Sequence, residues 1–353
     1  MTSVPSTTSP DISEQDAQRL HNLNLWLANI TTPKLDLTSM RPASADASFR
    51  RYFRIDGEAE GTKYSFIVMD APQPQEDVKP FIQIAQLFKQ INLTVPEVLA
   101  QDTEQGFLLL TDLGTTMYSH VLNSDTAHKL YMDAIDSLVL LQTQSQPDVL
   151  PEYDREFLKR ELMIFPEWYI NKHLGVTLTD EQNANLHKVF DALLANIMAQ
   201  PQVFVHRDYH SRNLMLMDKG NPGILDFQGA LYGPLTYDLV SLLRDAYVQW
   251  DEEMVLDWAI RYWEKAKKAG LPVAPDIDSF YRDFEFMGLQ RHLKILGIFA
   301  RLAHRDGKQH YLDDIPTVMD YVRKTSHRYK DLIPLLRLLD VLEETAPQFG
   351  YTF

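Results

Sequence analysis

The chain contains the stretch His206-Arg207-Asp208-Tyr209-His210-Ser211-Arg212-Asn213, followed by Asp226-Phe227-Gln228-Gly229. The carboxylate of Asp208 can accept a proton from an attacking hydroxyl group. The amide oxygen of Asn213 and the carboxylate of Asp226 are oxygen ligands of the kind that Mg²⁺ prefers. Phosphoryl transfer depends mainly on positioning and on the neutralisation of charge, and it needs these three groups. The stretch therefore predicts a phosphoryl-transfer site.

The residues around these side chains predict short strands. Apolar runs at 203–205, 214–217 and 223–225 have the length and composition of strands. The turn-forming segment 218–223 separates the last two runs, which is typical of a tight hairpin. Such a hairpin would place Asn213 and Asp226 side by side. Either aspartate alone would more often cap nearby backbone in a turn, and only the ordered set in its strand context favours a site.

The composition excludes several classes of protein. The 353 residues are 45% hydrophobic and 24% charged, which is ordinary for one or two globular domains. A net charge of −15 argues against binding to nucleic acid or to an anionic membrane. The absence of cysteine excludes disulfides and thiol chemistry. The sequence contains no run of about eighteen apolar residues, so it predicts no membrane-spanning helix. We expect a cytoplasmic protein, and the sequence leaves its oligomeric state open.

The hydrophobic pattern predicts two regions after a short tail. Residues 1–12 are rich in Thr, Ser and Pro and are predicted to form a disordered tail rather than a signal peptide. Residues 13–113 are expected to begin with a helix and to continue as a small sheet, with a second helix near 78–90. Strands are predicted at 48–55, 63–69, 96–100 and 106–111. Residues 114–353 are expected to be mostly helical, with helices near 125–144, 152–174, 180–199, 235–250, 252–269, 276–304, 315–328 and 331–345. This pattern predicts an α+β fold.

The motifs resemble those of the aminoglycoside phosphotransferase-like branch of the protein-kinase-like superfamily. The matching elements are His206, Asp208, His210 and Asn213 in the loop, Asp226 after Ile224-Leu225, and Gly233-Pro234 with Tyr237-Asp238-Leu239 beyond. The resemblance implies a bilobal fold with a small, sheet-rich, nucleotide-binding N-lobe and a large helical C-lobe. It also implies ATP and Mg²⁺ as cofactors, Asp208 as the catalytic base, and Asn213 and Asp226 as metal ligands.

Other stretches resemble the bacterial anomeric amino-sugar kinases of cell-wall recycling. They are residues 45–54, 68–72, 291–301 and 305–308. This resemblance implies phosphorylation of the anomeric hydroxyl of N-acetylmuramate and N-acetylglucosamine to a sugar 1-phosphate. Two alternatives stay open. One is a kinase of the same fold that acts on an aminoglycoside, a choline-like compound or another small amine. The other is a pseudokinase that binds nucleotide without turnover.

The chain departs from the family at the phosphate-binding positions. A glycine-rich loop is absent, since Ser44, Asp46 and Ser48 stand where glycines are expected, and Val68-Met69-Asp70 stands where a strand lysine or arginine would fall. We expect Arg50, with Arg51 and Arg54 as alternatives, to supply the missing positive charge. Ser48, Arg50, Leu110 and Asp112 are predicted to contact the nucleotide. Glu76 or Asp77 could pair with the phosphate-binding base, but the start of a helix is the interpretation that we favour for both.

Five further residues are assigned roles near the loop. His206 is expected to pack and hold the loop, and Asp238 is expected to accept hydrogen bonds from loop backbone N–H groups. His210, Arg244 and Arg291 are predicted to contact the substrate, although His210 could instead support Asp208, and Arg291 could be a solvated helix cation.

Overall fold

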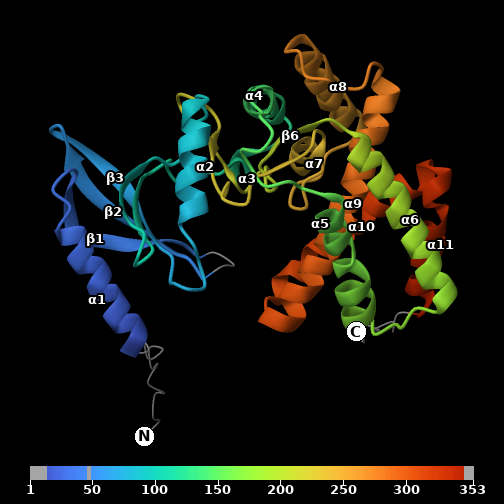
Figure 1. The fold of residues 1–353 in the computed structure, drawn as a ribbon, viewed down its shortest axis with the longest axis horizontal. Helices are drawn as coiled ribbons and strands as arrows, with labels where there is room; N and C mark the ends of the chain where they lie inside the picture. The colour runs from blue at the N-terminus through green and yellow to red at the C-terminus, as the bar shows by residue number, and fades with distance from the viewer. Residues whose placement is uncertain (1–13, 46–48, 346–353) are drawn as a thin grey trace, which may run out of the picture. The chain divides into compact units, whose positions relative to one another are not determined.

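The computed structural model describes residues 14–45 and 49–345, and they divide into two compact units. The first unit holds the residues up to Lys89 together with Val95–Leu113. The second unit holds Gln90–Thr94 and the chain from Gly114 onward. The first unit contains the large sheet, and the second contains most of the helices (Figure 1). Each unit is described by itself below.

The first unit is built on a five-stranded antiparallel sheet with the strand order β1-β2-β3-β5-β4. The strands are β1 (Lys34–Ala45), β2 (Arg51–Ala59), β3 (Thr62–Asp70), β4 (Val98–Asp102) and β5 (Phe107–Thr111). The hairpin predicted between β2 and β3 is confirmed, and Gly61 has the positive φ of 77° that its turn requires. The helix predicted near 78–90 is α2 (Lys79–Gln90).

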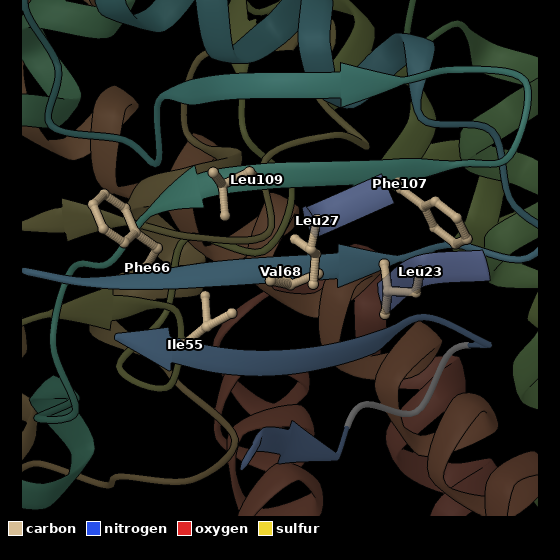
Figure 2. Close-up of a cluster of buried hydrophobic side chains, with 7 residues drawn as sticks. All are labelled: Leu23, Leu27, Ile55, Phe66, Val68, Phe107 and Leu109. Carbon is tan, nitrogen blue, oxygen red and sulfur yellow. The ribbon is translucent and has the colours of Figure 1, made fainter. Parts of the chain in front are cut away.

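Helix α1 (Glu14–Ala28) packs on one face of this sheet. Leu23 and Leu27 recur at helical spacing and enter a cluster of buried side chains from three strands, shown in Figure 2: Ile55, Phe66, Val68, Phe107 and Leu109. Residues two apart on a strand point to the same face, which is why 66 with 68 and 107 with 109 meet the helix together. An ion-pair network adds to this packing, because the buried carboxylate of Asp70 lies 2.6 Å from Arg19 of α1 and 2.5 Å from Arg51 of β2.

The second unit is mainly helical, and the thirty-residue helix α9 (Ile277–Asp306) contributes many of its buried residues. Gly297 of α9 allows a close approach to the backbone of Ile164, because a Cβ atom at Gly297 would lie 2.6 Å from the carbonyl of Ile164. The other helices are α3 (Tyr118–Val121), α4 (Ala127–Thr143), α5 (Arg155–Leu162), η1 (Phe165–His173), α6 (Asp180–Ala199), α7 (Tyr237–Leu243), α8 (Glu252–Lys268), η2 (Gln309–Asp314), α10 (Ile315–Arg328), η3 (Lys330–Leu332) and α11 (Ile333–Thr345).

Short strands interrupt these helices and carry the predicted motifs. Strand β6 (Gln202–Val205) pairs with β9 (Leu231–Pro234), and β7 (Leu214–Met215) pairs with β8 (Gly223–Ile224). The predicted hairpin is therefore confirmed, although its strands are shorter than expected. In the register of this hairpin Leu214 lies opposite Ile224, so the residues just outside the pair, Asn213 and Leu225, are also brought together.

The structure also differs from the predicted elements. The single helix expected at 152–174 is wrong, because α5 ends at Leu162 and the π-helical segment η1 follows it, with Pro166 in its first turn. Proline has no backbone N–H group, so a continuous α-helix through this position would lose a hydrogen bond. Helix α7 ends at Leu243, well before the predicted residue 250. Within residues 14–45 and 49–345, no helix has both the length and the apolar character needed to cross a lipid bilayer.

Candidate active site

The loop that joins β6 to β7 carries residues 206–213, and a buried carboxylate holds its start. Asp238, in the first turn of α7, accepts a hydrogen bond from the backbone N–H of His206 at 2.6 Å and another from that of Arg207 at 3.0 Å. Burial raises the pKa of Asp238 to about 7, against the lowering effect of these two hydrogen bonds. Asp238 therefore fixes the two residues that precede Asp208.

The imidazole of His206 is buried and holds the loop from the inside. Its Nε2 lies 2.9 Å from the carbonyl oxygen of Leu225, and its Nδ1 accepts a hydrogen bond from the backbone N–H of Asp208 at 3.2 Å. Burial lowers the pKa of His206 to about 4, so the ring is neutral at physiological pH, with its proton on Nε2. These contacts join the loop to the segment that carries Asp226.

Asp208 presents a half-exposed carboxylate next to two buried cations of α9. Its Oδ1 lies 3.8 Å from Nη2 of Arg291. Desolvation raises the pKa of Asp208, but the charges of Arg291 and Lys294 outweigh it and bring the pKa to about 2. The carboxylate is therefore ionised at physiological pH and able to accept a proton.

Arg207 has a strained backbone that is held at three points. Its φ is +79°, in the left-handed region that non-glycine residues rarely adopt. Beyond the hydrogen bond to Asp238, its carbonyl oxygen accepts a hydrogen bond from Nη1 of Arg291 at 2.8 Å. Its guanidinium lies 2.7 Å from the buried carboxylate of Glu161 on α5. Lys294 also pairs with Glu161, at 2.8 Å, and the hydroxyl of Tyr153 donates to it.

Asn213 and Asp226 lie together at the ends of the β7–β8 hairpin. Nδ2 of Asn213 donates to the backbone carbonyl of Asp208 at 2.9 Å and lies 3.5 Å from Oδ2 of Asp226. Asp226 has a φ of +60°, and its Oδ1 accepts a hydrogen bond from Nε2 of Gln228 at 2.6 Å. Nδ2 is therefore the amide atom turned toward the loop and toward Asp226, and Oδ1 is the oxygen that Asn213 has to offer a cation beside that carboxylate. This pair of oxygen donors fits Mg²⁺.

Three further groups contact this loop or the segment that carries Asp226. Glu161 pairs with Arg207 across 46 positions of the chain, and no local pattern marks it. Gln228 follows Asp226 in the motif itself, and its Oε1 is buried with no hydrogen-bond partner among the described residues. Asp245, just after α7, accepts hydrogen bonds from the backbone N–H of Ser211, at 3.0 Å, and from its hydroxyl. Only the position of Gln228 could have been noticed from the sequence.

The three residues predicted to contact the substrate lie in three different surroundings. Arg291 lies beside Asp208, as described above. His210 packs edge-on against the ring of Tyr247, with 5.5 Å between ring centres, and its buried Nδ1 has no hydrogen-bond partner in the part of the chain that the structure describes. Arg244 is buried and pairs with Glu285 at 3.0 Å and with Glu252 at 3.3 Å. The assignment of these residues to the substrate stays a prediction.

The predicted nucleotide contacts lie in the first unit. Arg50 lies 2.9 Å from Glu76, so Glu76 pairs with a cation, whereas Asp77 accepts a hydrogen bond from the backbone N–H of Lys79 at the start of α2. The helix-start interpretation thus holds for Asp77 and is wrong for Glu76. Asp112 accepts two hydrogen bonds from Arg54, at 2.6 and 3.0 Å. Leu110 is buried in β5, and Ser48 lies outside the described residues.

Comparisons with known proteins agree with this geometry. Residues 39–272 match the phosphotransferase enzyme family. A relative from Neisseria meningitidis, an N-acetylmuramate/N-acetylglucosamine kinase, is 49% identical over 95% of this chain and 100% of its own length. A relative of the same name from Pseudomonas aeruginosa is 46% identical over 94% of this chain and 99% of its own length. The family resemblance seen in the sequence is therefore confirmed.

Solved structures of much lower sequence identity share the fold. An ethanolamine kinase from Plasmodium vivax superposes with a TM-score of 0.63 at 10% identity, over 95% of this chain and 93% of its own. An ADP-bound aminoglycoside phosphotransferase superposes with a TM-score of 0.53 at 14% identity, over 87% of this chain and 97% of its own. The predicted protein-kinase-like α+β fold is confirmed. Because residues 39–272 match the family model and relatives of up to 49% identity align over almost the whole chain, the chain belongs to the phosphotransferase enzyme family.

Proposed function

We propose that this phosphotransferase uses ATP and Mg²⁺ to phosphorylate the anomeric hydroxyl of N-acetylmuramate and N-acetylglucosamine. The observation that carries the proposal is the ionised carboxylate of Asp208 in the loop that also carries Asn213, whose amide lies 3.5 Å from Asp226 at the other end of the β7–β8 hairpin. The relatives that match almost the whole chain are kinases of these two sugars by name. A kinase that draws on ATP works where ATP is abundant, so we place the protein in the cytoplasm.

The low pKa of Asp208 suits an anomeric hydroxyl. A hemiacetal hydroxyl loses its proton more readily than an ordinary alcohol, so a weak base is enough. As the C1 oxygen forms a bond to the γ-phosphorus, its proton passes to Asp208. The bond from that phosphorus to the β–γ bridging oxygen breaks at the same time, and ADP leaves. Holding the C1 oxygen in line with the γ-phosphorus would supply most of the rate.

Further side chains would hold the metal ion and keep Asp208 in place. We assign Asn213 Oδ1 and the carboxylate of Asp226 to Mg²⁺, which when bound neutralises charge on the transferring phosphates. Asp238 fixes the two residues before Asp208, His206 accepts a hydrogen bond from the backbone N–H of Asp208 itself, and Arg291 keeps the carboxylate of Asp208 ionised. In the first unit, Arg50, Leu110 and Asp112 stay our candidates for nucleotide contacts, with Ser48 in the segment that precedes Arg50.

The test uses purified protein, Mg-ATP and a panel of acceptors. We expect transfer to free N-acetylmuramate and N-acetylglucosamine, no transfer to their 1-O-methyl glycosides, and a phosphorus NMR signal coupled to the anomeric proton. Choline, ethanolamine and an aminoglycoside complete the panel. A 6-phosphate product, or turnover of a methyl glycoside, would show that another hydroxyl is attacked. Turnover of the amines alone would replace the proposed substrates, and ATP binding without any transfer would indicate a pseudokinase.

A further inference from the structure

The two proposed substrates differ in one ionised group. N-acetylmuramate carries a lactyl ether on the oxygen of C3, and this ether ends in a carboxylate, whereas N-acetylglucosamine has a hydroxyl there. A site that accepts both sugars and also recognises the carboxylate needs a cation near Asp208 that is not already committed to a protein carboxylate. The choice among the cations of the second unit follows from their partners.

Three cations around Asp208, two of them buried and one partly buried, are already engaged. Arg207 and Lys294 share the carboxylate of Glu161, at 2.7 and 2.8 Å. Arg291 donates to the carbonyl of Arg207 and to the hydroxyl of Tyr237 at 3.1 Å, and it faces Asp208. Moving any of these cations to a substrate would leave a buried protein group without its partner, which is costly. These three residues therefore hold the loop and are poor candidates for the substrate carboxylate.

Arg212 is different, because its side chain is exposed. It lies between Ser211 and Asn213 in the same loop as Asp208. Its guanidinium carbon is 3.5 Å from the centre of the Tyr247 ring. Within residues 14–45 and 49–345, no carboxylate lies at ion-pair distance from Arg212. Burial raises the pKa of Asp314, and the charge of Arg212 acts against this and lowers it. The guanidinium thus rests on an aromatic face and keeps its N–H donors available.

The buried carboxylate of Asp245 positions the backbone next to Arg212 and the backbone of Tyr247, on whose ring Arg212 stacks. Asp245 is 2% exposed. It holds Ser211 through the backbone N–H and the hydroxyl, and it accepts a hydrogen bond from the backbone N–H of Tyr247 at 3.1 Å. Ser211 is the neighbour of Arg212, so one carboxylate fixes the backbone next to the cation and the backbone of its aromatic support. Such preorganisation lowers the entropic cost of binding a ligand.

The surroundings of Tyr247 suit a sugar. His210 packs on one side of it, and Phe299 lies on another, with 6.4 Å between ring centres. The pKa of His210 is lowered mainly by burial. The carboxylates of Asp245 and Asp208 act in the opposite direction and raise it.

We propose that Arg212, supported by Tyr247, binds the lactyl carboxylate of N-acetylmuramate and so sets the preference of the enzyme between its two sugars. This inference rests on the proposed function. A planar guanidinium binds a carboxylate through two parallel hydrogen bonds, which explains the use of arginine at this position. The same guanidinium could also bind the phosphates of ATP. An experiment can distinguish binding of the sugar carboxylate from binding of the nucleotide phosphates.

The experiment compares kcat/KM for the two sugars in wild-type protein and in the Arg212→Gln variant. We expect the ratio of kcat/KM for N-acetylmuramate to that for N-acetylglucosamine to fall by about tenfold or more, because a charge-assisted hydrogen bond is lost for one sugar only. Arg212→Lys keeps the charge without the planar fork and should give a smaller fall. The matched control is Arg282→Gln, since Arg282 is also exposed and also stacks on an aromatic ring, Phe286, at 4.8 Å.

The outcomes separate the inference from the function on which it rests. An equal loss for both sugars, with a raised KM for ATP, would assign Arg212 to the nucleotide phosphates and overturn the inference. An unchanged ratio would make Arg212 a solvated surface cation and overturn it as well, while the proposed function stands. If the wild-type protein phosphorylates neither sugar, the proposed function is wrong and the inference falls with it.

Discussion

The carboxylate of Glu76 lies 2.9 Å from the guanidinium of Arg50, and both side chains are largely buried in the first unit. In protein kinases a strand lysine pairs with a helix glutamate, and that pair positions the lysine on the nucleotide phosphates. Here the strand lysine is absent, and an arginine next to β2 pairs with a glutamate ahead of α2. The Arg50–Glu76 pair has the chemical character of the missing lysine–glutamate pair, and it makes Arg50 the cation to test.

Replacing Arg50 with alanine should raise the KM for ATP or lower kcat, because a positive charge directed at the phosphates would be lost. The matched control is Arg41→Ala, which removes an exposed arginine of the same sheet, paired with Asp56 at 3.0 Å. Steady-state kinetics with ATP as the varied substrate would measure the difference. Wild-type kinetics in the Arg50 variant would leave the pair with a structural role only.

Replacing Asp208 with asparagine should lower kcat by at least about two orders of magnitude, because the proton acceptor is removed. Calorimetry should show that nucleotide affinity is largely kept. The exposed Asp218, in the turn between β7 and β8, provides a control as Asp218→Asn. A kcat within a few fold of wild type in the Asp208 variant would rule out the base assignment.

Replacing Asp226 with alanine should remove the dependence of ATP binding on Mg²⁺, because the amide oxygen of Asn213 alone is a weak site for a hard divalent cation. Titration calorimetry with and without Mg²⁺ measures this directly, and Asp218→Ala serves as the control. If Mg²⁺ strengthens ATP binding in the Asp226 variant as much as in the wild type, the metal ligands lie elsewhere in the chain.

Replacing Glu161 with glutamine should destabilise the protein by roughly 3–5 kcal/mol, because Arg207 and Lys294 would lose their shared counter-charge while staying largely buried. The control is Asp191→Asn, which breaks the exposed pair with Arg155 and should cost less than about 1 kcal/mol. Denaturant unfolding measures both variants. Equal, small losses would mean that the Glu161 cluster is well solvated.

His292 should make the stability of the protein depend on pH. Burial lowers its pKa to about 3, so below the ordinary value of 6.5 the unfolded chain takes up a proton that the folded chain does not. The contribution of His292 to the free energy of unfolding is fully present above pH 6.5, and it is lost as the pH falls from 6.5 toward 3. Between pH 7.5 and 4.5 the free energy of unfolding should fall more in the wild type than in His292→Gln, by roughly 2–3 kcal/mol. Parallel pH profiles for the two proteins would contradict this.

The parts of the fold predicted from the sequence are those with a local cause. The β2–β3 and β7–β8 hairpins have apolar strands on both sides of a turn, and α9 has a long helical pattern that the structure confirms from Ile277 onward. Strand β1 was not predicted, because half of the residues of Lys34–Ala45 are polar and the segment contains Pro42, and its pairing with β2 has two irregularities. Strand β9 was missed because its partner, β6, lies far earlier in the chain.

The same distinction applies to the site. Asp208, Asn213 and Asp226 could be proposed because the chemistry of phosphoryl transfer requires their side chains in one short segment. Glu161, Asp245 and the pairing of Arg50 with Glu76 could not, because each depends on elements that meet only after folding. Arg207 illustrates the limit: its place in the motif is visible in the sequence, but its left-handed backbone and its buried partner are not.

Helix α1 has a practical consequence for anyone who shortens the protein. Its leucines complete the hydrophobic cluster on the sheet (Figure 2). Its Arg19 shares the carboxylate of Asp70 with Arg51. A version that begins after Ala28 would uncover a continuous apolar surface on β2, β3 and β5 and would leave Asp70 with one cation fewer. Exposed apolar surface of this kind promotes self-association. We expect such a version to precipitate during purification even though every residue of the catalytic loop is still present.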